Sequence, residues 1–147
     1  METSQPREIG LVSCVKSKRE EAAVPKELYV SDYFEKMRSY AEREHDEWWI
    51  LSAEHGLLDP EGEPIDPYEK TLKNAGVAER RAWADDIVDD MVSEGFIDES
   101  VKIVVHAGKD YYEQLVPKLE AVEHVEVVIP TKGLAFGETL SWYKARV

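Results

Sequence analysis

Four short apolar runs alternate with longer amphipathic stretches along this chain. Each run is bounded by polar or turn-forming residues and is too short for a helix, which predicts buried β-strands. The predicted strands lie at 8–13, 48–52, 101–106 and 124–129.

Apolar residues also recur at the three- and four-residue spacing of amphipathic helices. Ser31 is a good N-cap for the first such segment, and Gly95 is a natural stop after the second, which has the clearest apolar stripe. The predicted helices lie at 31–44, 77–94, 109–121 and 136–145.

Two segments are predicted to be irregular. The first, 19–30, is charged and contains Pro25, and the second, 56–76, is dense in Gly and Pro. Connections longer than ~12–15 residues in compact domains are usually either functional or disordered. Ile65, Tyr68 and Leu72 give this one enough apolar content to pack down, so we expect 56–76 to form an ordered flap. Its Tyr68 is a candidate ligand-binding residue.

The alternation of strands and helices predicts a single α/β domain of three layers over 8–147, preceded by a flexible N-terminus at 1–7. We expect a mostly parallel four-stranded sheet with helices on both faces, a Rossmann-like arrangement. Right-handed crossovers then bring the carboxyl ends of all strands to one edge, where open α/β sheets bind their ligands. The residues that follow each strand are therefore the candidate site.

Net charge limits the choice of partners. The 147 residues carry a formal charge of −13, from 31 acidic and 18 basic side chains, which disfavours nucleic acid as a partner. Such a surface suits a salt-rich cytoplasm, so a halophilic source is a hypothesis. No apolar run approaches the ~20 residues of a membrane-spanning helix, and 1–7 lacks the apolar core of a signal peptide. We expect a cytoplasmic protein that does not bind membranes.

The first strand leads into Ser13, Cys14, Lys16 and Lys18, which we interpret as a cradle for an anionic group. The segment has neither the P-loop nor the dinucleotide-binding glycine pattern. Cys14 is the only cysteine, which excludes an internal disulfide and a Cys-rich zinc site. A buried thiol that packs as a small apolar group is its ordinary interpretation, and a nucleophile is the alternative.

The second strand leads into Ser52, Glu54, His55 and Gly56. A histidine beside a carboxylate at a strand end is a natural acid or base near neutral pH, so we interpret His55 and Glu54 as candidate catalytic residues. The alternative is a histidine that only hydrogen-bonds the adjacent loop.

The third strand leads into His106, Gly108 and Tyr111, and the fourth into Lys132. His106 is a further candidate catalytic residue, Gly108 lets the backbone approach a ligand, and Tyr111 can pack on a base or sugar. The two histidines could also ligate a metal with Glu54, but no paired-histidine spacing supports this, and we predict no metal site.

Several segments together resemble an uncharacterised bacterial and archaeal α/β domain family, often labelled YaaA-like after a peroxide-stress protein. A fainter similarity is to the central domain of archaeosine synthase, which acts on a 7-deazaguanine base in transfer RNA; there a Cys-Ser-Lys-like loop follows the first strand. The resemblance implies an α/β fold and a strand-end site. It rests on the segments 13–18 (SCVKSK), 26–29 (KELY), 50–58 (ILSAEHGLL), 67–72 (PYEKTL), 106–111 (HAGKDY) and 133–143 (GLAFGETLSWY).

These observations favour a small enzyme that acts on a nucleobase, nucleoside or nucleotide, with His55 or His106 transferring a proton. Its partner would be a small anionic or nucleobase-containing ligand, with the anion held by Lys16, Lys18 and Lys132. The alternatives are a nucleic-acid-binding stress-response protein and a ligand-binding module without catalysis.

Overall fold

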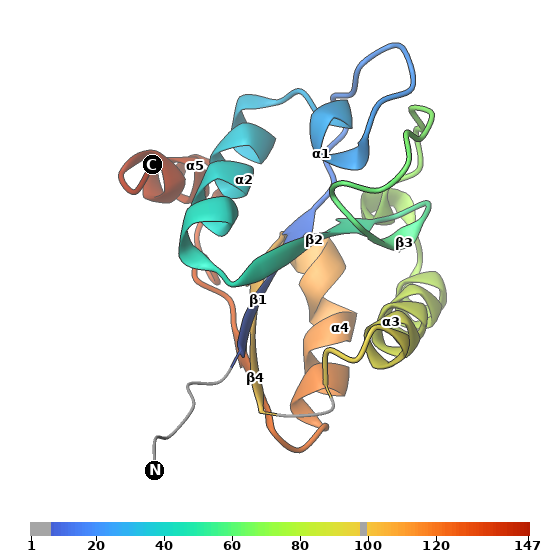
Figure 1. The fold of residues 1–147 in the computed structure, drawn as a ribbon, viewed down its shortest axis with the longest axis vertical. Coiled ribbons are helices and arrows are strands. Elements are labelled where there is room, and N and C mark those ends of the chain that lie inside the picture. Colours follow the sequence, from blue (N-terminus) through green and yellow to red (C-terminus); the bar gives the residue numbers. More distant parts are fainter. Residues whose placement is uncertain (1–6, 98–99) are drawn as a thin grey trace.

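A computed structural model describes residues 7–97 and 100–147, and most of the predicted flexible segment 1–7 lies outside these residues. They form a single α/β domain around a five-stranded sheet with the order β3-β2-β1-β4-β5 (Figure 1). The strands are β1 (Arg7–Ser13), β2 (Glu47–Ser52), β3 (Gly56–Leu58), β4 (Val101–His106) and β5 (Val125–Val128).

Four of these strands are the predicted ones, and they run parallel to one another. The predicted strand count of four is wrong by one, because β3 pairs antiparallel with β2. The segment 56–76 was expected to be irregular from its first residue. Instead, the chain reverses over Ala53–His55, and Gly56 at φ +73° returns it alongside β2. A glycine in the left-handed conformation is what a short hairpin of this kind requires.

Helices cover both faces of the sheet (Figure 1). One face carries α2 (Asp32–Glu44) and α5 (Phe136–Lys144), and the other carries α3 (Val77–Ser93) and α4 (Lys109–Glu120). All four agree with the prediction to within one or two residues at their ends. Ser31 is the N-cap of α2, as expected, since its hydroxyl accepts a hydrogen bond from the Phe34 N–H at 3.0 Å. Two short elements complete the fold, α1 (Pro25–Leu28) and a turn of 3₁₀-helix at Leu72–Asn74.

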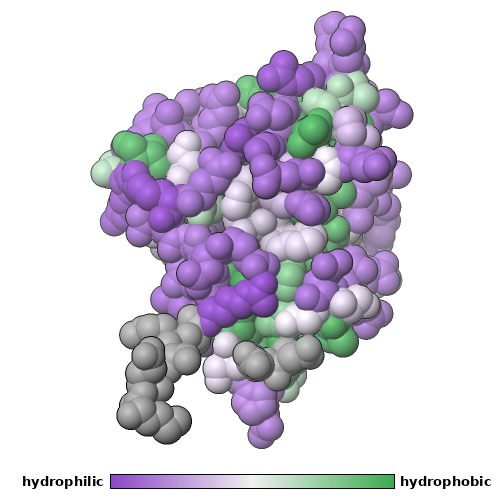
Figure 2. All heavy atoms as spheres, in the orientation of Figure 1, coloured by the Kyte–Doolittle hydropathy of each residue, from purple (hydrophilic) through white to green (hydrophobic). Residues whose placement is uncertain are grey.

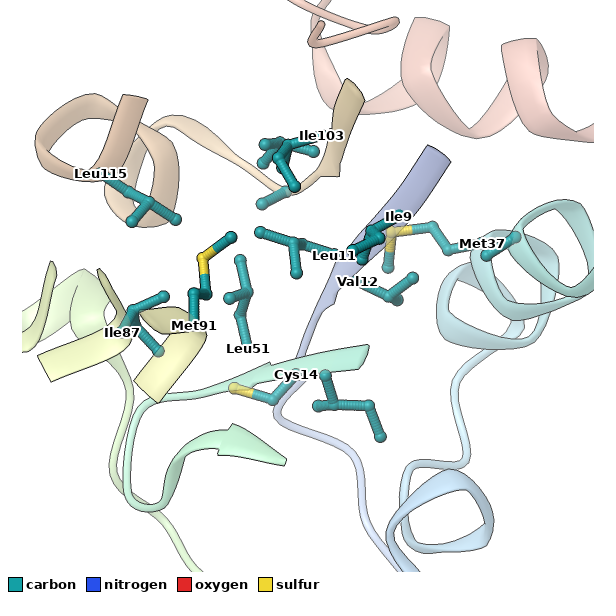
Figure 3. Close-up of a cluster of buried hydrophobic side chains, with 14 of the residues drawn as sticks. Ile9, Leu11, Val12, Cys14, Met37, Leu51, Ile87, Met91, Ile103 and Leu115 are labelled. Carbon is teal, nitrogen blue, oxygen red and sulfur yellow. The ribbon is translucent and has the colours of Figure 1, made fainter. Parts of the chain in front are cut away.

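The core lies on both sides of β1. Figure 3 shows Leu11 pointing toward Leu51 and Met91 on one side of the strand, whereas Val12 points toward Met37 of α2 on the other. Successive side chains of a strand point to opposite faces, so the odd-numbered residues of β1 face α3 and α4 and the even-numbered residues face α2 and α5. Within the described ranges, no helix is long and apolar enough to span a membrane.

The predicted ordered flap is confirmed as ordered. Ile65 forms a bridge with Ala23, and Tyr68 is half-buried and hydrogen-bonded to the end of β2. The segment 19–30 and the part of 56–76 that follows β3 therefore pack on each other. The segment 19–30 is not wholly irregular, because it contains the short helix α1 that begins at Pro25.

Candidate functional site

The strand order creates a switch point beside β1. Its neighbours β2 and β4 lie on opposite sides, so the chain leaves the carboxyl end of β1 in one direction and that of β4 in the other. Ligands of open α/β sheets bind in the crevice at such a point. A cavity of about 640 Å³ lies here, lined by residues that follow β1, β4 and β5; we call it the switch-point cavity.

One end of the switch-point cavity is rich in hydrogen-bond donors. Gly108 is the N-cap of α4 and has no side chain to cap the helix, so the N–H groups of Lys109 and Asp110 have no carbonyl partner among the described residues. Ser13 is only 4% exposed, and its hydroxyl lines the cavity without a hydrogen bond to another described residue. A helix N-terminus with free N–H groups favours an anion.

Two carboxylates in the wall of the switch-point cavity already have partners within the protein. Asp110 forms an ion pair with Arg80 at 3.2 Å, and Glu138 accepts a hydrogen bond from the Ala135 N–H at 2.9 Å. Although the chain as a whole is acidic, the negative charges nearest the cavity are thus partly compensated. The end of the cavity formed by α4 remains suited to an anionic group.

The switch-point cavity also has an exposed aromatic ring in its wall. Phe136 at the start of α5 is 66% exposed, and its ring lies edge-on to Tyr33 of α2 with 5.3 Å between centroids. A large aromatic side chain left in solvent beside a cavity is a ready surface for a flat ligand.

Between β1 and β2 lies a second feature, which we call the hydroxyl–thiol cluster: Cys14, Tyr29, Ser52, Tyr68 and Tyr111. The Tyr68 hydroxyl lies 2.6 Å from the Tyr29 hydroxyl and accepts a hydrogen bond from the Ser52 hydroxyl at 2.7 Å. The Cys14 thiol lies 3.3 Å from the Tyr111 hydroxyl. Cys14 and Tyr111 also line the switch-point cavity, so the cluster reaches its wall.

Burial keeps the three tyrosines of the cluster protonated. Burial, with a smaller contribution from the nearby Cys14, raises the pKa of Tyr68 and Tyr111 well above the usual tyrosine range. Burial likewise raises the pKa of Tyr29. These hydroxyls are therefore neutral near neutral pH and can donate hydrogen bonds.

Lys18 lies over this cluster, with its ammonium nitrogen 4.4 Å from the centre of the Tyr68 ring. Burial lowers the pKa of Lys18, while Cys14 and Glu69 act in the opposite direction. Of the three lysines predicted to hold an anion, Lys18 is the one that packs into the site. Lys16 and Lys132 are exposed, and neither lines the switch-point cavity.

His55 and Glu54 lie elsewhere. They are exposed at the tip of the β2–β3 hairpin and line a different cavity of about 560 Å³ with Gly56, Trp83 and several carboxylates of α3; we call this the acidic cavity. The His55 N–H donates to the Ser52 hydroxyl at 3.0 Å, and its ring contacts Tyr68 edge-on. The hairpin turn thus moves these two residues away from the strand edge on which they were expected.

His106 also lies away from the expected edge. It is the last residue of β4, as the predicted strand 101–106 has it, but it pairs in register with Val12, so its side chain points to the face covered by α2 and α5. There it is fully buried between His45 and Tyr143. Burial and the neighbouring His45 lower the pKa of His106 to about 3, which keeps it neutral.

The predicted set of residues is therefore divided. The structure brings Ser13, Cys14, Gly108 and Tyr111 together at the switch-point cavity, with Ser52, Tyr68 and Lys18 in the layer behind. It does not bring the two histidines into one cavity. Among the described residues, no group of three or more His, Cys, Asp or Glu side chains is arranged to hold a metal ion.

Sequence reasoning missed Phe136 in the cavity wall and the tyrosine partner of Tyr68. Tyr29 lies in the segment 26–29 that carries part of the resemblance. Its pairing with Tyr68 could not be predicted, because the two tyrosines are 39 residues apart in the sequence. The hairpin, in contrast, did have a signal: Gly56 followed by Leu57 and Leu58 reads as a turn and a returning strand.

Comparison with known proteins gives a family but no activity. No curated protein matches the chain significantly. The model of a family of unknown function, DUF6884, matches residues 9–145, which include every strand-end segment described above. The chain belongs to this family.

Proposed function

We propose that this chain is a small enzyme that acts on a nucleobase, nucleoside or nucleotide bound in the switch-point cavity. The observation that carries the proposal is that one cavity wall holds both an exposed aromatic ring, that of Phe136, and the free N–H groups at the start of α4. A nucleotide offers both complements in one molecule, because its base packs on aromatic rings and its phosphate accepts hydrogen bonds. The cavity volume of about 640 Å³ is in the range of small-molecule sites.

In this proposal the phosphate lies at the start of α4. It accepts hydrogen bonds from the N–H groups of Lys109 and Asp110 and from the Ser13 hydroxyl, three donors with no partner of their own among the described residues. The base lies against Phe136, where contact removes an exposed aromatic face from water.

The reacting part of the ligand then lies near Cys14. Once a thiol loses its proton, the resulting thiolate is a stronger nucleophile than a hydroxyl group. The Tyr111 hydroxyl at 3.3 Å is close enough to share a hydrogen bond with the Cys14 thiol. We assign Cys14 as the candidate nucleophile, in place of the two histidines, and Tyr111 as its hydrogen-bonding partner.

We also propose that the protein is cytoplasmic and that its sheet is Rossmann-like. The resemblance to YaaA-like proteins and to archaeosine synthase points to the same class of ligand, since the latter acts on a modified purine base.

The test is a calorimetric titration with nucleobases, nucleosides and nucleoside monophosphates. We expect nucleotides to bind more tightly than nucleosides, and Ser13→Ala to weaken nucleotide binding about tenfold, the effect of losing one hydrogen bond to a charged group. Phe136→Ala should weaken both ligands. The matched controls are Ser39→Ala and Val77→Ala, two exposed residues that line neither cavity.

Turnover is tested by mass spectrometry of the ligand after incubation with the protein. Conversion that is lost in Cys14→Ala, with binding retained, is the expected result. Absence of binding by every ligand contradicts the proposal, and binding without conversion identifies a non-catalytic ligand-binding module.

A further inference from the structure

The side chain of Arg80, near the start of α3, joins three segments of the chain. Its Nε–H donates to the Leu72 carbonyl at 2.8 Å, and an Nη2–H donates to the Lys73 carbonyl at 3.1 Å. Nη2 also lies 3.2 Å from the Asp110 carboxylate, in the first turn of α4. One guanidinium therefore ties both the end of the long loop and the start of α4 to α3.

Asp110 places a negative charge beside the anion site of the proposed function. Its own N–H is one of the free donors of that site, and its side chain lines the switch-point cavity. A carboxylate in the first turn of a helix interacts with the positive end of the helix, as a phosphate would, and like charges repel each other. Without compensation, the Asp110 carboxylate would therefore oppose the binding of an anion at the start of α4.

Arg80 compensates this charge. The ammonium of the neighbouring Lys109 lies 3.5 Å from the Glu113 carboxylate instead, on a side chain that is 75% exposed. Within the described part of the chain, Arg80 alone forms an ion pair with Asp110. Its side chain is only 21% exposed and is held by the two backbone carbonyls, so the guanidinium has a defined position beside the carboxylate.

A separate observation points to a ligand at this place. The Ser13 side chain is 4% exposed, lines the same cavity and has no hydrogen bond to another described residue. Buried hydroxyl groups in folded proteins almost always have a hydrogen-bond partner, which here would be a bound group or water. Ser13 and the start of α4 offer their donors to the same group, and the Arg80–Asp110 pair lies beside them.

We propose that Arg80 is the positioning residue of the anion site: by holding and neutralising Asp110, it makes the cavity prefer phosphorylated ligands over unphosphorylated ones. The inference rests on the proposed function, because the phosphate in question is that of the bound nucleotide. Arg80 does not line the switch-point cavity itself and acts through Asp110.

The experiment is a double-variant cycle, measured by calorimetric titration with the common nucleoside 5′-monophosphates and their nucleosides. Arg80→Gln should weaken nucleotide binding about tenfold, the order expected for one uncompensated charge near a phosphate, and change nucleoside binding by less than about twofold. Asp110→Asn keeps the backbone N–H and leaves Arg80 uncompensated, so it should strengthen nucleotide binding about threefold or more. The double variant lacks both charges and should bind nucleotides as the parent does.

The matched control is Arg81→Gln, which removes the same charge from an exposed residue one position along α3 and should leave the binding of both ligands unchanged. Three results overturn the inference while leaving nucleotide binding established: equal weakening of nucleotide and nucleoside by Arg80→Gln, a double variant as weak as Arg80→Gln, or an equal effect of Arg81→Gln. If Arg80→Gln does not fold, Asp110→Asn decides, and nucleotide binding that is unchanged or weaker in that variant overturns the inference.

Inorganic phosphate separates the inference from the proposed function. If no nucleotide binds, but phosphate shifts the amide NMR signals of Lys109 and Asp110 and does so less in Arg80→Gln, the proposed function fails and the role of Arg80 stands. An equal response of the parent and Arg80→Gln to phosphate overturns that role. Absence of any response to phosphate and to the nucleotides overturns both.

Discussion

At the scale of single residues, one hydroxyl joins the long loop to the sheet. Tyr68 comes from the segment between β3 and α3, and its oxygen contacts both Tyr29 and Ser52. Ser52 in turn accepts the N–H of His55, so the hairpin turn and the loop share one hydrogen-bond network. A group in such a network is costly to remove, since each of its partners is left unsatisfied in a buried place.

We therefore expect Tyr68→Phe to lower the free energy of unfolding by about 1–3 kcal/mol, the cost of leaving buried polar groups unpaired. Urea unfolding followed by circular dichroism measures the change. Tyr112→Phe is the matched control, because the Tyr112 hydroxyl has no hydrogen bond to another described residue and its removal should change stability by less than about 0.5 kcal/mol. Equal stability of the two variants contradicts the account of the cluster.

The sequence predicted most residues of this site by type and position but not by arrangement. Ser13, Cys14, Gly108 and Tyr111 converge because parallel strands end at one edge, which is a property of the fold class. His106 ends the strand predicted at 101–106, but the sequence did not indicate to which face of the sheet its side chain points. A strand that is buried on both faces is a continuous apolar run, and such a run has no alternation that would distinguish the two faces.

At the scale of elements, β1 and the turn after α2 are in unusually close contact. Gly10 lies in the middle of β1 on the face of α2, and the His45 ring covers it so closely that a Cβ at this position would lie 2.4 Å from the His45 Cδ2. Glycine weakens a strand interior, so its presence here is explained by the close approach of the ring.

Gly10→Ala should push the His45 ring out of contact with Glu8 and His106 and lower the free energy of unfolding by about 1–3 kcal/mol, the usual cost of overpacking. Gly137→Ala in α5 is the control: a Cβ there has nothing within 4 Å, and alanine favours the helix by up to about 1 kcal/mol. Chemical denaturation of both variants measures the two changes in the free energy of unfolding, which should have opposite signs. A neutral or stabilising Gly10→Ala would show that the contact is not tight.

The elements themselves were largely predictable, because the four main strands are short apolar runs between polar residues and the four main helices have apolar residues at helical spacing. The exception, β3, is three residues long and contributes no periodicity of its own. It exists because Gly56 can take a positive φ and because the exposed edge of β2 offers it hydrogen-bond partners.

At the scale of the whole molecule, charge is the dominant surface property. Hydrophilic residues cover most of the face drawn in Figure 2, and the chain carries a formal charge of −13. The exposed side of α3 adds a row of carboxylates beside the acidic cavity, including Asp86 and Asp89. Repulsion among them opposes folding and is screened by salt, because the Debye length falls to about 3 Å at 1 M.

Stability should therefore rise with KCl. We expect the Tm to increase by a few degrees between 0.1 and 2 M KCl, which corresponds to about 1 kcal/mol or more. The double variant Asp86→Asn, Asp89→Asn should be more stable than the parent at low salt and gain less from KCl. Scanning calorimetry measures both proteins, and an unchanged Tm across the salt series rejects the hypothesis of adaptation to a salt-rich cytoplasm.

Binding of a nucleotide in the switch-point cavity can be observed at single residues by amide ¹H–¹⁵N NMR during titration with nucleoside monophosphates. The largest shifts should occur at the N–H groups of Lys109 and Asp110 at the start of α4, and they should shrink when the matching nucleoside without phosphate is used. Largest shifts at His55 and Gly56 in the acidic cavity, or no shift with any of these nucleotides, would contradict binding in the switch-point cavity.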